Sequence, residues 1–244
     1  MKRALAFGLP VLFLVAAAVV FLLNPGWRKE VILKMLGKRT VLEVINRIGP
    51  EARSRYRPHF ENAGAAYPPR KILLLAFKEE RLLEVWAENG GHPVFICEYP
   101  IVGASGGPGP KLREGDLQVP EGRYRVSGMN PNSAFYLSLK LDYPNAFDKQ
   151  QAEADGRTNL GGDIFIHGGS ASIGCLAMGD QAIEELFVLS ADVGLENIEV
   201  LLAPSDFRQG HAFPRNTGPA WANALYGELA TALEPFRRGG QEGR

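Results

Sequence analysis

The chain has 244 residues, of which 45% are hydrophobic and 22% are charged, and its 27 Lys and Arg residues balance its 27 Asp and Glu residues. This composition is typical of a globular protein, and a net charge of zero argues against a nucleic-acid partner. Two cysteines cannot build a disulfide framework. The cysteines and the four histidines also lack metal-ligand spacing, so we expect no metal site.

The N-terminus carries an uninterrupted apolar run over residues 4–23, preceded by Lys2 and Arg3. A helix of this length spans the roughly 30 Å hydrocarbon core of a bilayer. A cleaved signal peptide has a shorter apolar region and a small-residue cleavage site. We therefore predict an uncleaved transmembrane anchor over residues 1–27, with cleavage as the alternative. Basic residues follow the run as well as precede it, so the charge rule alone does not fix its topology.

A helical stalk is predicted over residues 28–67. Apolar residues recur at helical spacing over 28–48. We expect Gly49-Pro50 to end that helix and residues 51–62 to form a second, shorter one. Tyr67-Pro68-Pro69 then marks the boundary to a domain over residues 68–207.

Strands dominate from residue 71. Residues 71–77 and 81–87 predict a hairpin, and 93–99 a third strand. Over residues 134–141 apolar and polar residues alternate, which predicts a half-buried strand with Phe135, Leu137, Leu139 and Leu141 on one face. The remaining expected elements are strands at 163–167 and 198–202, a helix at 180–191 capped by Asp180, a helix at 220–236, and a C-terminal region over 208–244 made of this last helix and a polar tail.

One stretch combines the residue types of nucleophilic catalysis. His167 ends a predicted strand, a Gly- and Ser-rich loop follows, and Cys175 comes eight residues later. A cysteine attacks carbonyl groups as a thiolate, and a neighbouring histidine supplies proton abstraction or positive charge. The loop can bring both side chains within hydrogen-bond reach, and Gly174 allows close backbone approach, so that the N–H groups of Gly174 and Cys175 could bind an oxyanion. The alternative is a small buried thiol without chemistry.

The other candidate groups are predicted to be structural. Cys97 lies in an apolar strand, which indicates a buried thiol, and His59, His92 and His211 fall in loops. Asp163 is four residues from His167 along one strand, roughly 13 Å, too far for a direct hydrogen bond. The group that orients the imidazole stays open between Ser170, Ser172 and a backbone carbonyl.

The pair His167-Gly168 and the run Ser172-Ile173-Gly174-Cys175 resemble the signature of the L,D-transpeptidase catalytic-domain family, which acts on bacterial peptidoglycan. The loop between His167 and Cys175 is shorter than in most of that family, Ile173 stands where a histidine is common, and Ala177 stands where an arginine is common. These departures resemble a short-loop branch that includes murein L,D-transpeptidase-like proteins and a peptidoglycan–lipoprotein amidase. Further matches to that branch, over roughly residues 45–205, are Tyr67-Pro68-Pro69, residues 109–112, residues 114–116, residues 118–122 and residues 129–133.

The resemblance implies a mainly β, sandwich- or barrel-like domain with flanking helices and no cofactor. It makes Cys175 the nucleophile, His167 the general base and acid, and the backbone at Gly174 and Cys175 the oxyanion site. The expected substrate-binding residues are Gly168, Ser170, Ser172 and Lys111, because stem peptides carry free carboxylates and the amine of a diamino acid.

The reaction implied is acyl transfer on peptidoglycan stem peptides through a cysteine thioester. An amine acceptor gives a cross-link or a protein attachment, whereas water makes the protein an amidase or carboxypeptidase, for example one that releases an envelope lipoprotein. The implied location is the bacterial inner membrane, crossed once, with the domain in the periplasm, or a cleaved periplasmic form. Two alternatives from other classes are a non-catalytic peptidoglycan-binding envelope protein and a redox-sensing thiol, for which Cys97 is the only available partner.

Overall fold

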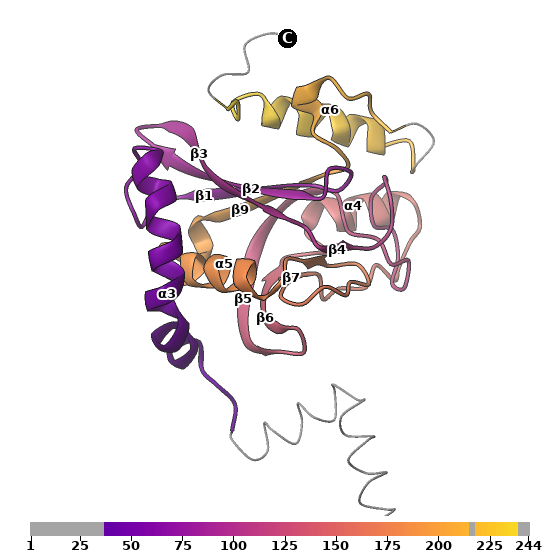
Figure 1. Cartoon of the computed structure of the whole chain (residues 1–244). Coiled ribbons are helices and arrows are strands. Elements are labelled where there is room, and N and C mark those ends of the chain that lie inside the picture. Colours follow the sequence, from indigo (N-terminus) through magenta and orange to yellow (C-terminus); the bar gives the residue numbers. More distant parts are fainter. Residues whose placement is uncertain (1–36, 215–217, 239–244) are drawn as a thin grey trace, which may run out of the picture. The chain divides into compact units, whose positions relative to one another are not determined.

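The computed structural model describes residues 37–214 and 218–238 (Figure 1). A compact unit begins at Val41 and takes in the rest of the described chain. The anchor predicted over residues 1–27 lies outside the described residues. Within the described ranges, no helix has both the length and the apolar character needed to cross a membrane.

The described strands form one nine-stranded sheet in the order β3-β2-β1-β9-β5-β6-β7-β8-β4. Most pairs are antiparallel, but β1 runs parallel to β9 and β7 runs parallel to β8. The sheet confirms the prediction of a mainly β core with flanking helices. The strand bounds are β1 Ile72–Phe77, β2 Leu82–Asn89, β3 His92–Pro100, β4 Gly103–Ala104, β5 Gly122–Ser133, β6 Tyr136–Leu141, β7 Phe165–His167, β8 Leu176–Ala177 and β9 Ile198–Ala203.

The long strand β5 divides the sheet into two parts. Its first residues, Gly122 to Arg125, pair with β9, and its later residues, Val126 to Ser133, pair with β6. We call β3, β2, β1 and β9 the first half-sheet, and β6, β7, β8 and β4 the second half-sheet. Pairing shifts register twice along the β5–β6 ladder, so β5 bends as it passes from one half to the other.

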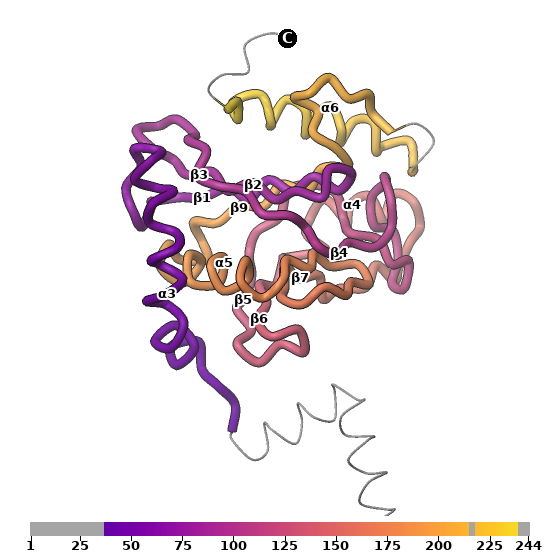
Figure 2. Tube along the Cα trace, in the orientation of Figure 1, coloured from indigo at the N-terminus to yellow at the C-terminus, as the bar shows by residue number. Residues whose placement is uncertain are grey.

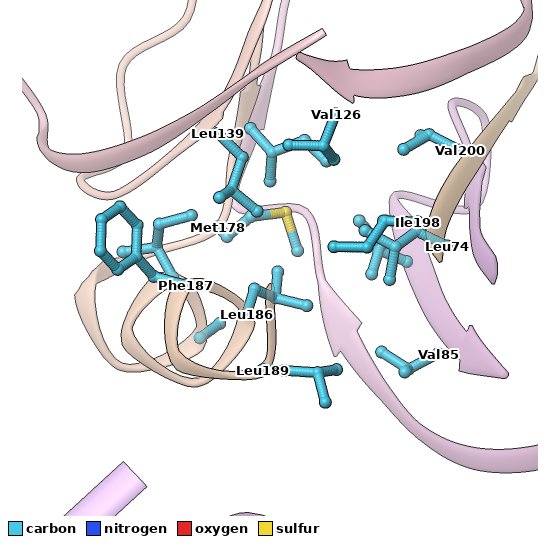
Figure 3. Packing of buried hydrophobic residues seen from close by; sticks show 14 of the residues in the cluster. Leu74, Val85, Val126, Leu139, Met178, Leu186, Phe187, Leu189, Ile198 and Val200 are labelled. Atoms are coloured by element: carbon cyan, nitrogen blue, oxygen red, sulfur yellow. The ribbon is translucent and has the colours of Figure 1, made fainter. Parts of the chain in front are cut away.

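The principal core lies between the sheet and helix α5 (Asp180–Val193), which presents Leu186, Phe187 and Leu189 to the strands. Figure 3 shows Met178, just before α5, among these side chains and those of both half-sheets. A second apolar cluster joins helix α6 (Ala222–Leu233) to the first half-sheet, and Figure 2 shows α6 as a separate layer there. Besides the long helix α3 (Val41–Asn62), the remaining described helices are α4 (Ala146–Ala154) and the short 3-10 turns η1 (Leu195–Asn197) and η2 (Phe207–Gln209).

Helix α3 (Val41–Asn62) differs from the predicted pair of helices, because it continues through both Pro50 and Pro58. A proline inside a helix costs about 3 kcal/mol or more through its missing N–H and the crowding of the preceding turn. Burial offsets this cost, because one face of α3 lies in the principal core. The buried residues on that face include Val44, Ile48, Ala52, Tyr56 and Phe60.

Helix α3 occupies part of the range 28–67, over which a stalk was expected. The described part of that range packs against α5, where Arg53 pairs with Asp192 and Arg55 with Glu185. The compact unit thus begins before the predicted boundary at Tyr67-Pro68-Pro69.

Two local predictions near α5 and β6 are wrong. Asp180 does not cap α5: it is the first helical residue, and its Oδ1 accepts a hydrogen bond from Gly169 N–H at 2.8 Å. Phe135 does not join the core face of the 134–141 strand and is 41% exposed. The alternation fails because Tyr136 has φ of 73° and Leu137 N–H donates to Phe135 O, which makes a tight three-residue turn. Strand β6 therefore starts at Tyr136, two residues later than predicted.

Candidate active site

The parallel pairing of β7 and β8 determines where Cys175 and His167 lie. Ile166 pairs with Leu176 and His167 with Ala177. Cys175 directly precedes β8 and thus comes beside Phe165, two residues before His167 on the neighbouring strand. Since side chains alternate along strands, this register directs the side chains at positions 165, 167 and 175 to one face of the second half-sheet. The opposite face, with Ile166 and Leu176, belongs to the core.

The Cys175 sulfur contacts the backbone at the start of β7. Sγ donates to Asp163 O at 3.7 Å, and the N–H of Phe165 interacts with the sulfur. Partial burial raises the pKa of the Cys175 thiol, and the negative charge of Asp163 adds to this rise. The N–H of Phe165 and the positive charge of Lys111 lower the pKa, but the net shift is upward. In the resting structure Cys175 is thus a protonated thiol, only partly shielded from solvent.

His167 is 2% exposed, and one ring nitrogen has a backbone partner. Its Nδ1 lies 2.6 Å from Gly168 O, so Nδ1 carries the proton and donates it to that carbonyl, which leaves Nε2 as the acceptor. Burial lowers the pKa of His167, and the bond to Gly168 only partly opposes this effect. The imidazole is thus neutral at pH 7. Of the orienting groups left open by the sequence, the backbone carbonyl is the one found.

The expected hydrogen bond between Cys175 and His167 is not formed. Among the described residues, the sulfur bonds Asp163 O and the imidazole bonds Gly168 O. The directions of both pKa shifts favour a neutral thiol and a neutral imidazole over an ion pair. The arrangement therefore suits proton abstraction by His167 better than a resident thiolate held by an imidazolium charge.

Phe135 is a site residue that the sequence did not indicate. Its ring stacks on the His167 imidazole with centroids 4.5 Å apart and planes at 27°. Because Phe135 is itself half-exposed, it forms the cover over the imidazole. The turn at Tyr136 directs the Phe135 ring onto the imidazole, and no residue pattern in the sequence predicts this turn.

The loop before the nucleophile is held by Ser172. Its hydroxyl donates to Cys175 O at 2.6 Å and accepts from Cys175 N–H at 3.0 Å. The N–H of Cys175 is thus occupied here, which differs from the expected oxyanion role of both N–H groups. Gly174 has φ of 118°, and a Cβ at that position would lie 3.2 Å from Gln118 O. Glycine is required there by conformation, and the space beside it is tight.

The predicted substrate-binding residues separate into different roles. Ser172 holds the backbone of Cys175, and Gly168 is buried, with no room for a Cβ next to Phe135 O and Asp180 Oδ1. Lys111 is 8% exposed, and its Nζ donates to Asp116 Oδ1 at 2.6 Å and to Arg113 O at 2.9 Å. Its charge thus stabilises the loop that contains it. Ser170 is exposed.

The other candidate groups lie apart from this site. Cys97 is buried in β3, and burial raises the pKa of its thiol to about 12; both cysteines are free thiols. His211 faces Glu80 at 3.1 Å. A cavity of about 550 Å³ lies between β5, β9, α4 and α6, lined in part by Arg123 and Arg125, and neither Cys175 nor His167 lines it. In the described ranges, no three His, Cys, Asp or Glu side chains are placed to hold a metal ion.

Comparison with known proteins identifies the domain. The YkuD family, described as the L,D-transpeptidase catalytic domain, matches residues 71–195, just over half of the chain. The chain is also 37% identical over 118 residues to "Putative L,D-transpeptidase YafK" of Escherichia coli K12 and to its counterpart in Escherichia coli O157:H7. That alignment covers 48% of this chain and 46% of each relative, so the similarity spans about half the length of these relatives.

Solved structures also resemble the chain at lower identity. The helical cell shape determining protein Pgp2 of Campylobacter jejuni is 22% identical, with a TM-score of 0.45 over 58% of this chain and 50% of Pgp2. Bd1075 of Bdellovibrio bacteriovorus is 22% identical, with a TM-score of 0.42 over 69% of this chain and 55% of that protein.

Proposed function

The chain belongs to the L,D-transpeptidase catalytic-domain family, and on that premise we propose that it is a cysteine acyl-transfer enzyme acting on peptidoglycan stem peptides. The observation that supports this proposal best is the β7–β8 register, which directs Cys175 and His167 to one face inside the matched region. One side chain is a partly exposed thiol, and the other is a neutral imidazole with a free acceptor nitrogen.

The first step transfers a proton and forms a thioester. On substrate binding, the Cys175 side chain rotates away from Asp163 O and gives its proton to Nε2 of His167. The sulfur attacks the carbonyl carbon of the diamino-acid residue, and a C–S bond forms. The tetrahedral intermediate then collapses as the C–N bond breaks, and His167 returns the proton to the leaving amine.

The second step releases the acyl group. An amine or a water molecule attacks the thioester carbonyl, gives a proton to Nε2, and the proton returns to the Cys175 sulfur as the C–S bond breaks. Gly174 N–H is the proposed oxyanion donor, joined by Cys175 N–H once Ser172 Oγ releases it. An amine yields a cross-link or protein attachment, and water yields hydrolysis, including release of a peptide-linked lipoprotein.

The anchor and the cellular location remain part of the proposal. We propose that residues 4–23 hold the chain in the bacterial inner membrane with the domain in the periplasm, where peptidoglycan is available. The apolar run and its length support this placement.

The test is incubation of the full-length chain with muropeptides, with and without an added amine acceptor, followed by mass analysis of products. A dimer or acceptor adduct indicates transfer, and loss of a terminal residue indicates hydrolysis. A carbapenem-type acylating agent should add its mass to Cys175 and leave Cys97 unmodified. Unchanged muropeptides together with an unmodified Cys175 would contradict the proposal.

A further inference from the structure

The charges of Lys111 and Asp163 both act on the Cys175 thiol, and each belongs to a lysine–aspartate pair of a different character. Lys111 and Asp116 are buried, with side chains 6% and 13% exposed, and they satisfy each other and the loop backbone. Lys140 and Asp163 are 44% and 77% exposed, with Nζ 2.7 Å from Oδ1. Only an exposed pair can exchange its mutual contact for a ligand without breaking the fold.

The exposed pair lies directly beside the nucleophile. The backbone carbonyl of Asp163 accepts the hydrogen bond of the Cys175 sulfur, so the side-chain carboxylate of Asp163 belongs to a residue in direct contact with the thiol. Lys140 pairs with Phe165 across the β6–β7 ladder, and its Nζ lies 5.8 Å from the centre of the Phe165 ring. The thiol, the aromatic ring and the two charges thus occupy neighbouring positions on one face.

The backbone at Asp163 is also unusual. Its φ of 54° is a conformation that glycine adopts freely, and its neighbours Gly161 and Gly162 show that glycine is used in this turn. Aspartate tolerates this conformation better than most residues but still at a cost. Asp163 thus places a carboxylate at a position where glycine would adopt the same backbone conformation without strain.

We infer that Lys140 and Asp163 form a subsite for a zwitterionic amino-acid head group at the end of the donor's side chain. Lys140 Nζ receives the carboxylate, Asp163 receives the ammonium group, and the Phe165 ring supports the methylene chain that leads to the reacting carbonyl. This inference rests on the proposed function, because it assigns the diamino acid of the stem peptide to the site. It replaces Lys111 as the charged group that recognises this residue.

The exchange is energetically accessible. An exposed ion pair contributes little to stability, so opening it costs little. Two new charge-assisted contacts to one ligand replace one contact between flexible side chains.

The test uses two tetrapeptide probes and the full-length Cys175→Ala protein, so that binding is measured without turnover. One probe carries meso-diaminopimelate in the third position, and the other carries L-lysine, which has the amine but lacks the side-chain carboxylate. By calorimetry, the first probe should bind about tenfold more tightly, the lower range for a charged hydrogen bond. Adding Lys140→Gln should remove this preference and leave the lysine probe unchanged, whereas Asp163→Asn should weaken both probes.

The matched control is Lys71→Gln, which removes the exposed pair of Lys71 with Glu199 at the first half-sheet and should change neither affinity. In the Cys175 background, Lys140→Gln should raise KM for the diaminopimelate donor about tenfold and keep kcat within about twofold. Equal affinity for the two probes, or a preference that survives Lys140→Gln, would overturn the subsite. Selective binding without turnover by the wild-type chain would instead overturn the proposed enzyme and leave the subsite standing.

Discussion

The two half-sheets differ in how the backbone is used. In the first, β1 pairs with β2 and with β9 over six residues each, and most side chains of these three strands are buried. In the second, β7 and β8 have three and two residues, and turns interrupt the ladder. Three of the four described non-glycine residues with positive φ, Leu117, Tyr136 and Asp163, surround this second part. Regular pairing supplies stability in one half, and local strain places functional groups in the other.

The two cysteines give the largest test of this difference. Cys175→Ala should reduce turnover of muropeptides by at least about ten-thousand-fold, equivalent to about 5.5 kcal/mol, because no other group near the site forms a thioester. Cys97→Ala in the first half-sheet should leave kcat within about twofold, since its thiol is buried in β3. Residual turnover by Cys175→Ala would place the chemistry elsewhere in the molecule.

The second test compares two lysines near the ends of β1. Lys78 is buried and bonds Glu121, Gly109 O and Val119 O, whereas Lys71 forms an exposed pair with Glu199. Lys78→Met leaves a buried carboxylate without its cation and should lower the free energy of unfolding by about 3 kcal/mol. Lys71→Met should change it by less than about 1 kcal/mol. Urea unfolding followed by circular dichroism measures both, and equal losses would show that burial does not distinguish the two pairs.

The third test uses the pH dependence of alkylation. Because burial raises the pKa of Cys175 above its ordinary value of 9.0, the thiol is protonated at pH 7 and ionises only at alkaline pH. The rate of iodoacetamide addition to Cys175 in the Cys97→Ala protein should therefore keep rising beyond pH 9. A midpoint near pH 6 would instead demonstrate a thiolate–imidazolium pair in the resting site.

The same reasoning sets the acid limb of turnover. His167 must be neutral to accept the thiol proton, and burial lowers its pKa below the ordinary value of 6.5. Activity should thus persist below pH 6.5 and fall only as the imidazole becomes protonated. A plot of kcat/KM against pH reports this limb.

The smallest expected effect comes from the aromatic cover. Phe135→Ala removes the ring stacked on His167, and the imidazole gains access to water. Since burial is the main cause of the lowered pKa, the pKa of His167 should rise towards its ordinary value of 6.5. NMR titration of the imidazole protons measures this shift. Phe213→Ala removes a half-exposed ring that packs on Phe207 and Tyr226, and it should leave the His167 titration unchanged.

The sequence predicted the hairpin of β1 and β2, the strands β3 and β9, and the helices α5 and α6, because their apolar periodicity is local and continuous. It did not predict α4, whose start depends on a capping box between Asn145 and Asp148 in a polar stretch. It also ended a helix at Gly49-Pro50, where burial of the α3 face outweighs the local cost of proline. Local pattern fails where packing over long sequence separation decides the outcome.

By itself, the sequence identified Cys175 and His167 as the reactive candidates, because a strand-ending histidine, a Gly- and Ser-rich loop and a cysteine stand at short separation along the chain. Only the tertiary structure decided what each group contacts. It directed His167 Nδ1 to Gly168 O, placed Phe135 over the ring, enclosed Lys111 with Asp116, and left Lys140 and Asp163 exposed beside the thiol. The physical reason is that the burial of a side chain and its hydrogen-bond partners depend on strands that lie far apart in the sequence. Burial and partners together determine the charge of each group in the site and the atoms that it can contact.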